Sequence, residues 1–378
     1  MVWNFENSYN NLPDIFYSKV KLNSFINKKL ILFNSSLAKE LNLNFDKFGK
    51  DDICNVLLGA KLSNNEFLSQ AYAGHQFGHF TILGDGRALL LGEHITKDNQ
   101  RFDIQLKGSG KTPYARNGDG KAALGPMIRE YLVSEAMHNL GIPSTRALAV
   151  ISTGEKIYRE KIESGAILIR VAKSHLRIGT FQFGSILKNR EKFFELVHYT
   201  INRLYPELNN QKNKYIKFFE TICSLQTNLI VNWMRVGFIH GVMNTDNVSL
   251  SGETIDYGPC AFLDNYNPKT VLSSIDKMGR YSFENQSKIS LWNLARLGDA
   301  ILHLIDDDQK KAINIIEGIL IKYRDIFKIK WYSMMCKKLN IKFENNYQDL
   351  IKEFLDLMHI NKLDFTNTFV DLENNNLD

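Results

Sequence analysis

Cysteine is scarce in this sequence, and its spacing excludes several kinds of site. The 378 residues contain four cysteines, too far apart to form a CxxC pair: Cys54, Cys223, Cys260 and Cys336. Neither a zinc site nor a thioredoxin-like redox pair is therefore indicated. Scattered thiols of this kind are typical of proteins from a reducing compartment.

Long apolar runs are also missing. The chain has no stretch of about 18 apolar residues, which a membrane-spanning helix would need. Its amino terminus, MVWNFENSYNNLPDIF, lacks the basic region and apolar run of a secretory signal. We therefore expect a cytoplasmic protein with no membrane partner, and a monomer is the working expectation.

Charge of one sign is not concentrated in any block. The net charge is +6, and lysine and arginine are spread along the chain. A basic stripe with interleaved aromatics is absent, so a nucleic-acid partner is not expected. A local basic pocket for phosphates would account for the excess equally well. At 44% hydrophobic and 23% charged residues, the composition is that of a globular protein with a sizeable core.

One polar stretch, HGVMNTDNVSLSGETIDYGP at residues 240–259, has the residue types of a metal site. Asn247 and Asp256 offer amide and carboxylate oxygens, which suit magnesium. The order also parallels the kinase motifs H-R-D-x-x-x-x-N and D-F-G. Val242 stands where kinases place their catalytic Asp and cannot accept a proton, which leaves Asp246 as the nearest acid. A plain Asn-Asp turn is the alternative interpretation.

The first half of the chain has candidate phosphate-binding residues. Gly84, Gly86 and Arg87 form a turn whose backbone could approach phosphates closely, or a turn that only leads into a strand at 88–92. The alternating FDIQLK predicts a strand that ends at Lys107. A kinase-type fold pairs such a lysine with a helical glutamate. The amphipathic helix predicted at 126–140 supplies two candidates, Glu130 and Glu135.

Further polar residues follow in loops and at strand ends. Asp119 and Gly120 lie in a loop of about 15 residues, a length typical of functional or mobile loops. Strands predicted at 147–151 and 166–171, around a turn at Gly154, lead to Arg170 and Arg177. Two arginines suit bidentate capture of a phosphate, although surface arginines are the commoner case. His75 and His79 stand four apart within YAGHQFGHF, where the glycines favour a packed turn over a metal site.

The order of predicted elements indicates an α+β fold of protein-kinase-like, two-lobed type. Strands dominate the first half, and helices are predicted at 215–236, 291–305, 309–327 and 347–358. The expected organisation is an extension at 1–65 packed on the body, a strand-rich N-lobe at 66–172 and a helical C-lobe at 173–378.

Several long strings resemble the SelO family of protein adenylyltransferases, also called the YdiU family. They include YAGHQFGHFTILGDGRALLLGE, DIQLKGSGKTPYARNGDGKAAL, REYLVSEAMHNLGIPSTRAL and SSIDKMGRYSFENQ, besides the stretch at 240–259. The resemblance implies a kinase-like fold that binds ATP in a flipped orientation. It implies transfer of AMP to Ser, Thr or Tyr hydroxyls of proteins, with release of pyrophosphate.

The resemblance also assigns roles to residues. Asp246 would be the proton acceptor, and Asn247 and Asp256 would hold Mg²⁺, with Mn²⁺ as the alternative ion. Glu130 would pair with Lys107. The implied ATP-binding residues are Gly84, Gly86, Arg87, Lys107, Asp119, Gly120, Arg170 and Arg177, with Glu130 and Asp256 in the same site. A kinase that transfers the γ-phosphate and a nucleotide-binding pseudokinase remain alternatives, and UTP remains an alternative to ATP.

Members of that family usually extend beyond this length, and some end with a selenocysteine or cysteine. This sequence ends at Asp378 in an acidic, Asn-rich tail. Regulation through a carboxyl-terminal thiol is therefore not expected here.

Overall fold

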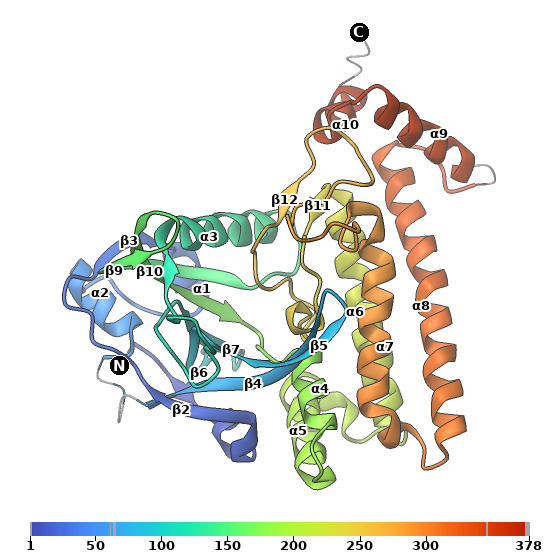
Figure 1. Ribbon diagram of the computed structural model, residues 1–378. Coiled ribbons are helices and arrows are strands. Elements are labelled where there is room, and N and C mark those ends of the chain that lie inside the picture. Colours follow the sequence, from blue (N-terminus) through green and yellow to red (C-terminus); the bar gives the residue numbers. More distant parts are fainter. Residues whose placement is uncertain (1, 61, 63–65, 345–346, 375–378) are drawn as a thin grey trace. The chain divides into compact units, whose positions relative to one another are not determined.

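The structure is a computed structural model that describes residues 2–60, 62, 66–344 and 347–374. The chain divides into two compact units (Figure 1). The first comprises Met1–Asn209 and Val248–Tyr257, and the second comprises Asn210–Asn247 and Gly258–Asp378. The first unit is rich in strands and the second in helices, which confirms the α+β class. The boundaries expected at residues 65 and 172 stay a prediction.

The first unit is built on a ten-stranded antiparallel sheet. Its main path runs β2-β4-β6-β7-β10-β9-β3, while β1 pairs with β6, β5 with β4 and β8 with β10. The strands are β1 (Phe5–Glu6), β2 (Tyr17–Lys21), β3 (Lys29–Phe33), β4 (Glu66–Gln76), β5 (His79–Gly84), β6 (Ala88–Ile95), β7 (Arg101–Lys107), β8 (Ala122–Ala123), β9 (Arg146–Tyr158) and β10 (Ile162–Ala172).

The amino-terminal segment contributes strands to this sheet. β2 pairs with β4 over five residues, and β3 pairs with β9 at one end of the sheet path. Two short helices, α1 (Ser35–Glu40) and α2 (Lys50–Leu57), follow β3. Their side chains Leu37, Ile53 and Leu57 belong to the main hydrophobic cluster of this unit. The amino-terminal segment is therefore part of the sheet and of its hydrophobic core, in addition to packing on the body.

Alternation along β7 separates an apolar face from a polar one. Ile104 and Leu106 are fully buried in the main hydrophobic cluster. Successive side chains of a strand point to opposite faces, so Gln105 and Lys107 lie on the other face. On β10, Arg170 is opposite Gln105 in the antiparallel register. The sequence pattern of these two strands therefore gathers polar side chains on one face of the sheet.

Helix α3 (Leu124–Asn139) covers this second face. Its Met127 packs with Val150 and Leu168, which come from β9 and β10. The helix stops before Gly141, whose φ of +72° is the left-handed conformation that commonly ends helices. The helix predicted at 126–140 is confirmed, and it carries Glu130 on its buried side.

The turn predicted at Gly154 is wrong. β9 runs through this glycine to Tyr158, and β10 begins at Ile162, so residues 159–161 connect the two strands. Gly154 has a φ of +76°, and a Cβ there would lie 2.5 Å from the Cβ of Asn27. This glycine is needed because the strand passes close to a neighbouring segment, which the sequence pattern could not distinguish from a turn.

The remaining helices include one that is longer than expected. α4 (Ile178–Ser185) and α5 (Arg190–Leu204) belong to the first unit. The second unit has the short pair β11 (Phe238–Ile239) and β12 (Ala261–Phe262), with helices α6 (Lys214–Arg235), α7 (Gln286–Ile305), α8 (Gln309–Lys338), α9 (Tyr347–Ile360) and α10 (Phe365–Glu373). α8 extends eleven residues beyond the predicted end at 327, because no proline interrupts it. None of the described helices has the length and apolar content needed to cross a bilayer.

Candidate active site

A buried lysine at the end of β7 is the centre of the site. The Nζ of Lys107 donates to Glu130 Oε2 at 2.6 Å, and it also donates to Asp256 Oδ1. The Lys107 and Glu130 side chains are 7% and 3% exposed. The ion pair expected between them is therefore present. Glu135, the other candidate, pairs with Arg146 at 2.7 Å.

Arg170 joins the same cluster from β10. Its guanidinium donates to Asp256 Oδ1 at 2.9 Å and lies 3.5 Å from Glu130 Oε1. It also donates to the amide oxygen of Gln105. Arg170 is 2% exposed. A cation buried this deeply requires charged and polar partners, and the two carboxylates provide them.

Arg177 adds a third cation to this cluster. Its guanidinium lies 3.6 Å from Asp85 and 3.7 Å from Asp256 Oδ2. The same group stacks over the ring of Tyr72 at 4.6 Å. Gln105 donates to Asp85 at 3.0 Å, which links the arginine back to the strand of Lys107. Three cations and three carboxylates thus form one connected network within the first unit.

Residues 248–257 reach the sheet because the backbone holds both of their ends. Near the start, Ile178 N donates to Val248 O at 3.0 Å, and Leu250 N donates to Leu176 O at 2.9 Å. Near the end, Thr254 N donates to Pro143 O at 2.9 Å. These contacts place Asp256 beside Lys107, although 149 positions of sequence separate the two.

Asp256 has an unusual backbone and a strongly perturbed carboxylate. Its φ is +66°, a left-handed conformation that residues other than glycine rarely adopt. Such strain is often found at functional sites. Burial would raise the pKa of Asp256, but Lys107, Arg170 and Arg177 together hold that pKa well below its usual range. Asp256 is therefore an anion at neutral pH.

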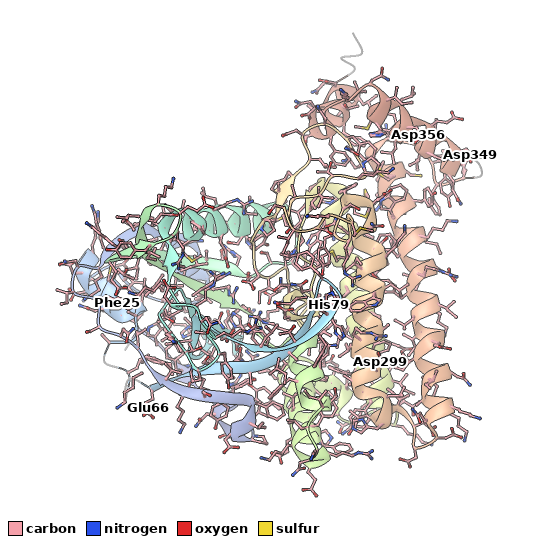
Figure 2. The ribbon with its side chains drawn as sticks, in the orientation of Figure 1. Phe25, Glu66, His79, Asp299, Asp349 and Asp356 are labelled. Carbon is pink, nitrogen blue, oxygen red and sulfur yellow. The ribbon has the colours of Figure 1, made fainter. Side chains whose placement is uncertain are left out.

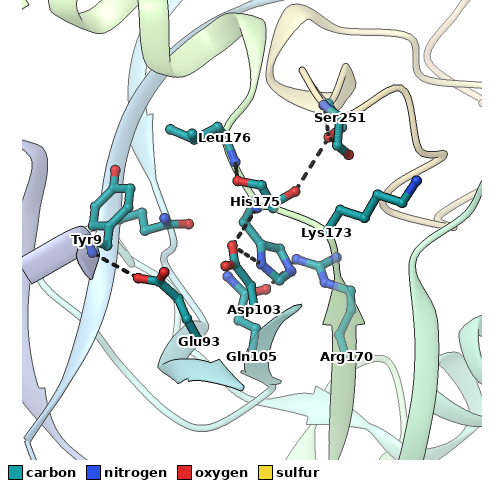
Figure 3. A network of polar contacts seen from close by, with 12 residues as sticks. Tyr9, Glu93, Asp103, Gln105, Arg170, Lys173, His175, Leu176 and Ser251 are labelled. Carbon is teal, nitrogen blue, oxygen red and sulfur yellow. Dashed lines mark hydrogen bonds and ion pairs between the residues drawn. The ribbon is translucent and has the colours of Figure 1, made fainter. Parts of the chain in front are cut away.

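A second polar network lies further along the same strands (Figure 3). Asp103 accepts from the backbone N of His175 at 2.7 Å and lies 3.2 Å from its Nδ1. Burial lowers the pKa of His175 to about 4, so this imidazole is neutral at pH 7. Glu253 accepts from Lys173 N at 2.9 Å and from Ser251 at 2.8 Å, and burial raises its pKa to about 7.

The glycine-rich turn adjoins the end of β7. Gly108 N donates to Arg87 O at 2.7 Å, so the turn at 84–87 lies next to the residue that follows Lys107. A Cβ on Gly86 would lie 2.9 Å from the backbone oxygen of Tyr114, which explains the need for glycine there. The structure brings this predicted element to the cluster, with the Arg87 side chain exposed.

Asp119 makes its ion pair outside the cluster. Its carboxylate pairs with Arg159 at 2.8 Å, and this hydrogen-bonded arginine holds the pKa of Asp119 at about 2. Gly120 O accepts from Gly110 N at 3.0 Å, and a Cβ on Gly120 would lie 2.2 Å from Gly110 O. The two residues thus shape the loop between β7 and β8, and their expected contact with nucleotide remains a prediction.

Asp246 and Asn247 belong to the second unit, in a loop held by neutral side chains. The amide nitrogen of Asn247 donates to Val242 O at 2.9 Å, and that of Asn293 donates to Met243 O at 2.9 Å. Asp246 is 6% exposed. The Asn247 contact leaves its amide oxygen as the donor atom for a cation. An amide oxygen is a type of ligand that magnesium accepts.

The two spaced histidines do not share the site. His75 contacts Gln182 at 2.8 Å, whereas His79, labelled in Figure 2, is exposed at the start of β5. Across the described ranges, no group of three or more His, Cys, Asp or Glu is placed to hold a metal. The magnesium site expected from Asn247 and Asp256 includes an asparagine, which is not one of these four residue types. It therefore remains a prediction.

Sequence reasoning missed two members of the cluster. Asp85 lies between Gly84 and Gly86, in the turn interpreted as a phosphate-binding element. Gln105 shares the polar face of β7 with Lys107 and is fully buried. The alternating pattern of FDIQLK could have identified Gln105. The role of Asp85 depends on Arg177, 92 positions later, and only the folded chain shows it.

Comparison with known proteins places the chain among nucleotidyltransferases. Residues 1–378 match the family model described as "Protein adenylyltransferase SelO". The protein nucleotidyltransferase YdiU of Pelagibacter ubique is 50% identical over 374 residues, 98% of this chain and 77% of that protein. The YdiU of Clostridium perfringens is 53% identical over 377 residues, with 98% and 76% covered.

Two solved structures are also similar. One is a Toxoplasma gondii virulence factor described as having a protein-kinase fold and no enzymatic activity. It has a TM-score of 0.34 and 9% identity, with 80% of this chain and 85% of that chain covered. The other is a Toxoplasma gondii rhoptry antigen kinase domain, with a TM-score of 0.31 and 11% identity, covering 81% and 91%.

Proposed function

The chain belongs to the SelO family of protein adenylyltransferases, and we propose that its first-unit cluster binds the triphosphate of the ATP whose AMP it transfers to protein hydroxyls. The observation that supports this proposal is the direct contact of Lys107 with Asp256. It joins a strand-end lysine to the carboxylate of the D-Y-G segment. In kinase-type folds a strand lysine and a metal-binding carboxylate both serve the phosphates of one nucleotide, so the two must lie near each other.

The charges of the cluster suit this role. Lys107, Arg170 and Arg177 are buried cations whose partners include Asp256. Attack at the α-phosphorus builds negative charge on phosphate oxygens, and fixed cations stabilise it. A magnesium ion held by Asn247 and Asp256 would add positive charge at the phosphates when bound. Glu130 keeps Lys107 in place through its 2.6 Å contact.

Asp246 is the proposed proton acceptor. A protein hydroxyl is a weak nucleophile at neutral pH and needs a nearby base. Asp246 lies in the short helical turn Thr245–Asn247, next to the proposed metal ligand Asn247. Val242, at the position of the kinase base, offers only its backbone oxygen, which accepts from Asn247. ATP is the proposed nucleotide and a protein bearing Ser, Thr or Tyr the proposed acceptor.

The position of the label separates the proposal from its alternatives. Wild-type protein is incubated with acceptor proteins and ATP labelled at either the α- or the γ-phosphate. We expect label from the α position on protein, with release of pyrophosphate. Label only from the γ position would identify a kinase. No label from either position, with nucleotide still bound, would identify a pseudokinase.

A further inference from the structure

Two large apolar side chains are exposed on one loop of the second unit. Met278 is 92% exposed and Ile275 is 68% exposed. Within the described ranges, no other large hydrophobic side chain is as exposed as Met278. Each such side chain left in water forgoes roughly 1.5–3 kcal/mol of burial free energy. Two of them within four positions suggest a binding surface.

The loop holds these side chains outward because its backbone is fixed. Asp276, which lies between them, is 6% exposed. Its carboxylate accepts from Arg280 N at 2.9 Å and from Tyr281 N at 2.8 Å. Asn285 donates to Gly279 O at 2.9 Å. A loop tied by its own buried carboxylate cannot readily fold its tip inward, so the exposure is a built feature.

The same loop is bonded to the segment that carries Asp246. Tyr281 is 1% exposed, and its hydroxyl donates to Asn244 Oδ1 at 2.6 Å. Asn244 precedes Asp246 by two positions, and its backbone oxygen accepts a hydrogen bond from Asn247 N at 2.9 Å. A partner seated on the tip would therefore contact an element directly attached to the proposed proton acceptor.

The charge of the tip indicates the chemistry of its partner. Lys277 is exposed between Ile275 and Met278. The Arg280 guanidinium stacks 4.6 Å from the Trp292 ring, which fixes a second cation beside the tip. Asp276, the acid of this segment, is turned inward onto the backbone. The surface thus presents apolar contacts together with positive charge, which complements an apolar side chain flanked by carboxylates.

We propose that this loop, residues 273–281, is the docking site for the protein substrate. The substrate would be an extended segment with an apolar residue and neighbouring Asp or Glu, close in sequence to the modified hydroxyl. This inference rests on the proposed function, because it names the substrate class of the same reaction. The bond between Tyr281 and Asn244 gives the docking site its connection to Asp246.

The test compares variants of the tip with a matched pair elsewhere. Ile275→Ser/Met278→Ser removes the apolar contacts, and Lys277→Glu reverses the charge. Ile326→Ser/Ile329→Ser on α8, where the side chains are 46% and 57% exposed, is the control in the same unit. The acceptor probes are dephosphorylated β-casein, which is acidic, and histone, which is basic. The readouts are kcat/KM for transfer of the α label and calorimetric affinity for ATP.

We expect wild type to prefer casein. The tip double variant should lose about tenfold or more in kcat/KM for casein, about 1.4 kcal/mol per tenfold, with ATP affinity unchanged. Lys277→Glu should shift the preference toward histone, and the α8 control should stay within twofold of wild type. Equal labelling of casein by wild type and the tip variants would overturn the docking site alone.

Two further outcomes are informative. If wild type labels neither acceptor, the proposed function fails and the docking site fails with it. If the tip variants label casein normally but lose sedimentation with anionic phospholipid vesicles that wild type shows, the loop is a lipid contact and the substrate-docking proposal is overturned.

Discussion

The two units hold their proposed catalytic residues by different interactions. In the first unit, Asp256 is fixed by the cations Lys107 and Arg170. In the second unit, the loop of Asp246 is fixed by neutral amides such as Asn293, which bond to backbone oxygens. A change in the first unit therefore disturbs a balance of buried charge, whereas a change in the second disturbs the shape of a loop.

The largest expected effect comes from Asp256→Ala. The change removes a carboxylate shared by three cations, so we expect loss of AMP transfer on the order of 10³-fold. Leaving buried cations without their anion should also cost about 3 kcal/mol of unfolding free energy. Transfer of the α label measures the loss of activity, and denaturant unfolding measures the loss of stability. Unfolding unchanged from wild type would show that the cations do not depend on this residue.

In the second unit, Asp246→Asn should separate activity from stability. The replacement keeps the size of the side chain and removes its capacity to accept a proton. We expect kcat to fall by roughly 10²-fold, with unfolding and ATP affinity close to wild type. Labelling that persists at the wild-type rate would exclude Asp246 as the base and direct attention to another acceptor.

A double-mutant cycle on Lys107 and Glu130 measures how strongly the buried charges depend on one another. We expect Lys107→Met and Glu130→Gln to be non-additive, with a coupling free energy on the order of 1–3 kcal/mol in unfolding. The exposed pair of Lys217 and Glu220, 2.7 Å apart on α6, is the control and should couple by less than about 0.5 kcal/mol. Equal coupling in the two cycles would contradict a special role for burial.

Glu253→Gln tests the charge that burial disfavours. The pKa of Glu253 is raised from 4.5 to about 7, so the folded chain binds this proton more tightly than the unfolded chain. The stability it contributes is present below about pH 4.5 and is lost as pH rises through 7. The glutamine variant should exceed wild type in stability at pH 8, by on the order of 3 kcal/mol, and the difference should vanish below about pH 4.5. A difference independent of pH would contradict this.

The smallest effect is expected from Asn293→Ala. It removes the 2.9 Å bond to Met243 O and leaves a buried carbonyl without this donor. We expect a loss of about 1–2 kcal/mol in unfolding free energy and a decrease in kcat of less than tenfold. Asn232→Ala removes a similar 2.9 Å bond on the exposed side of α6 and should cost less. Equal losses would show that the loop does not depend on its buried amide.

The local sequence pattern determined the secondary-structure elements and most of the candidate residues that were proposed on those elements. The alternation of FDIQLK predicted β7, and the amphipathic run before Gly141 predicted the extent of α3. The structure shows that the buried side of this helix carries Glu130 and Met127, while Leu132 is exposed. These signals lie within a few turns of chain, where periodicity and stop residues act directly. The same reasoning misplaced the turn at Gly154, because a glycine required by a close neighbour looks like a turn.

Only the tertiary structure decided which charges meet. Asp85 pairs with Arg177, 92 positions later, and Asp256 reaches Lys107 because backbone bonds at both ends hold residues 248–257 in the first unit. Asp119 looked equivalent to these acids in sequence, yet it pairs with Arg159 instead. The physical reason is that electrostatic partners are chosen by distance in space, and a local pattern does not encode which distant segment the sheet register brings alongside.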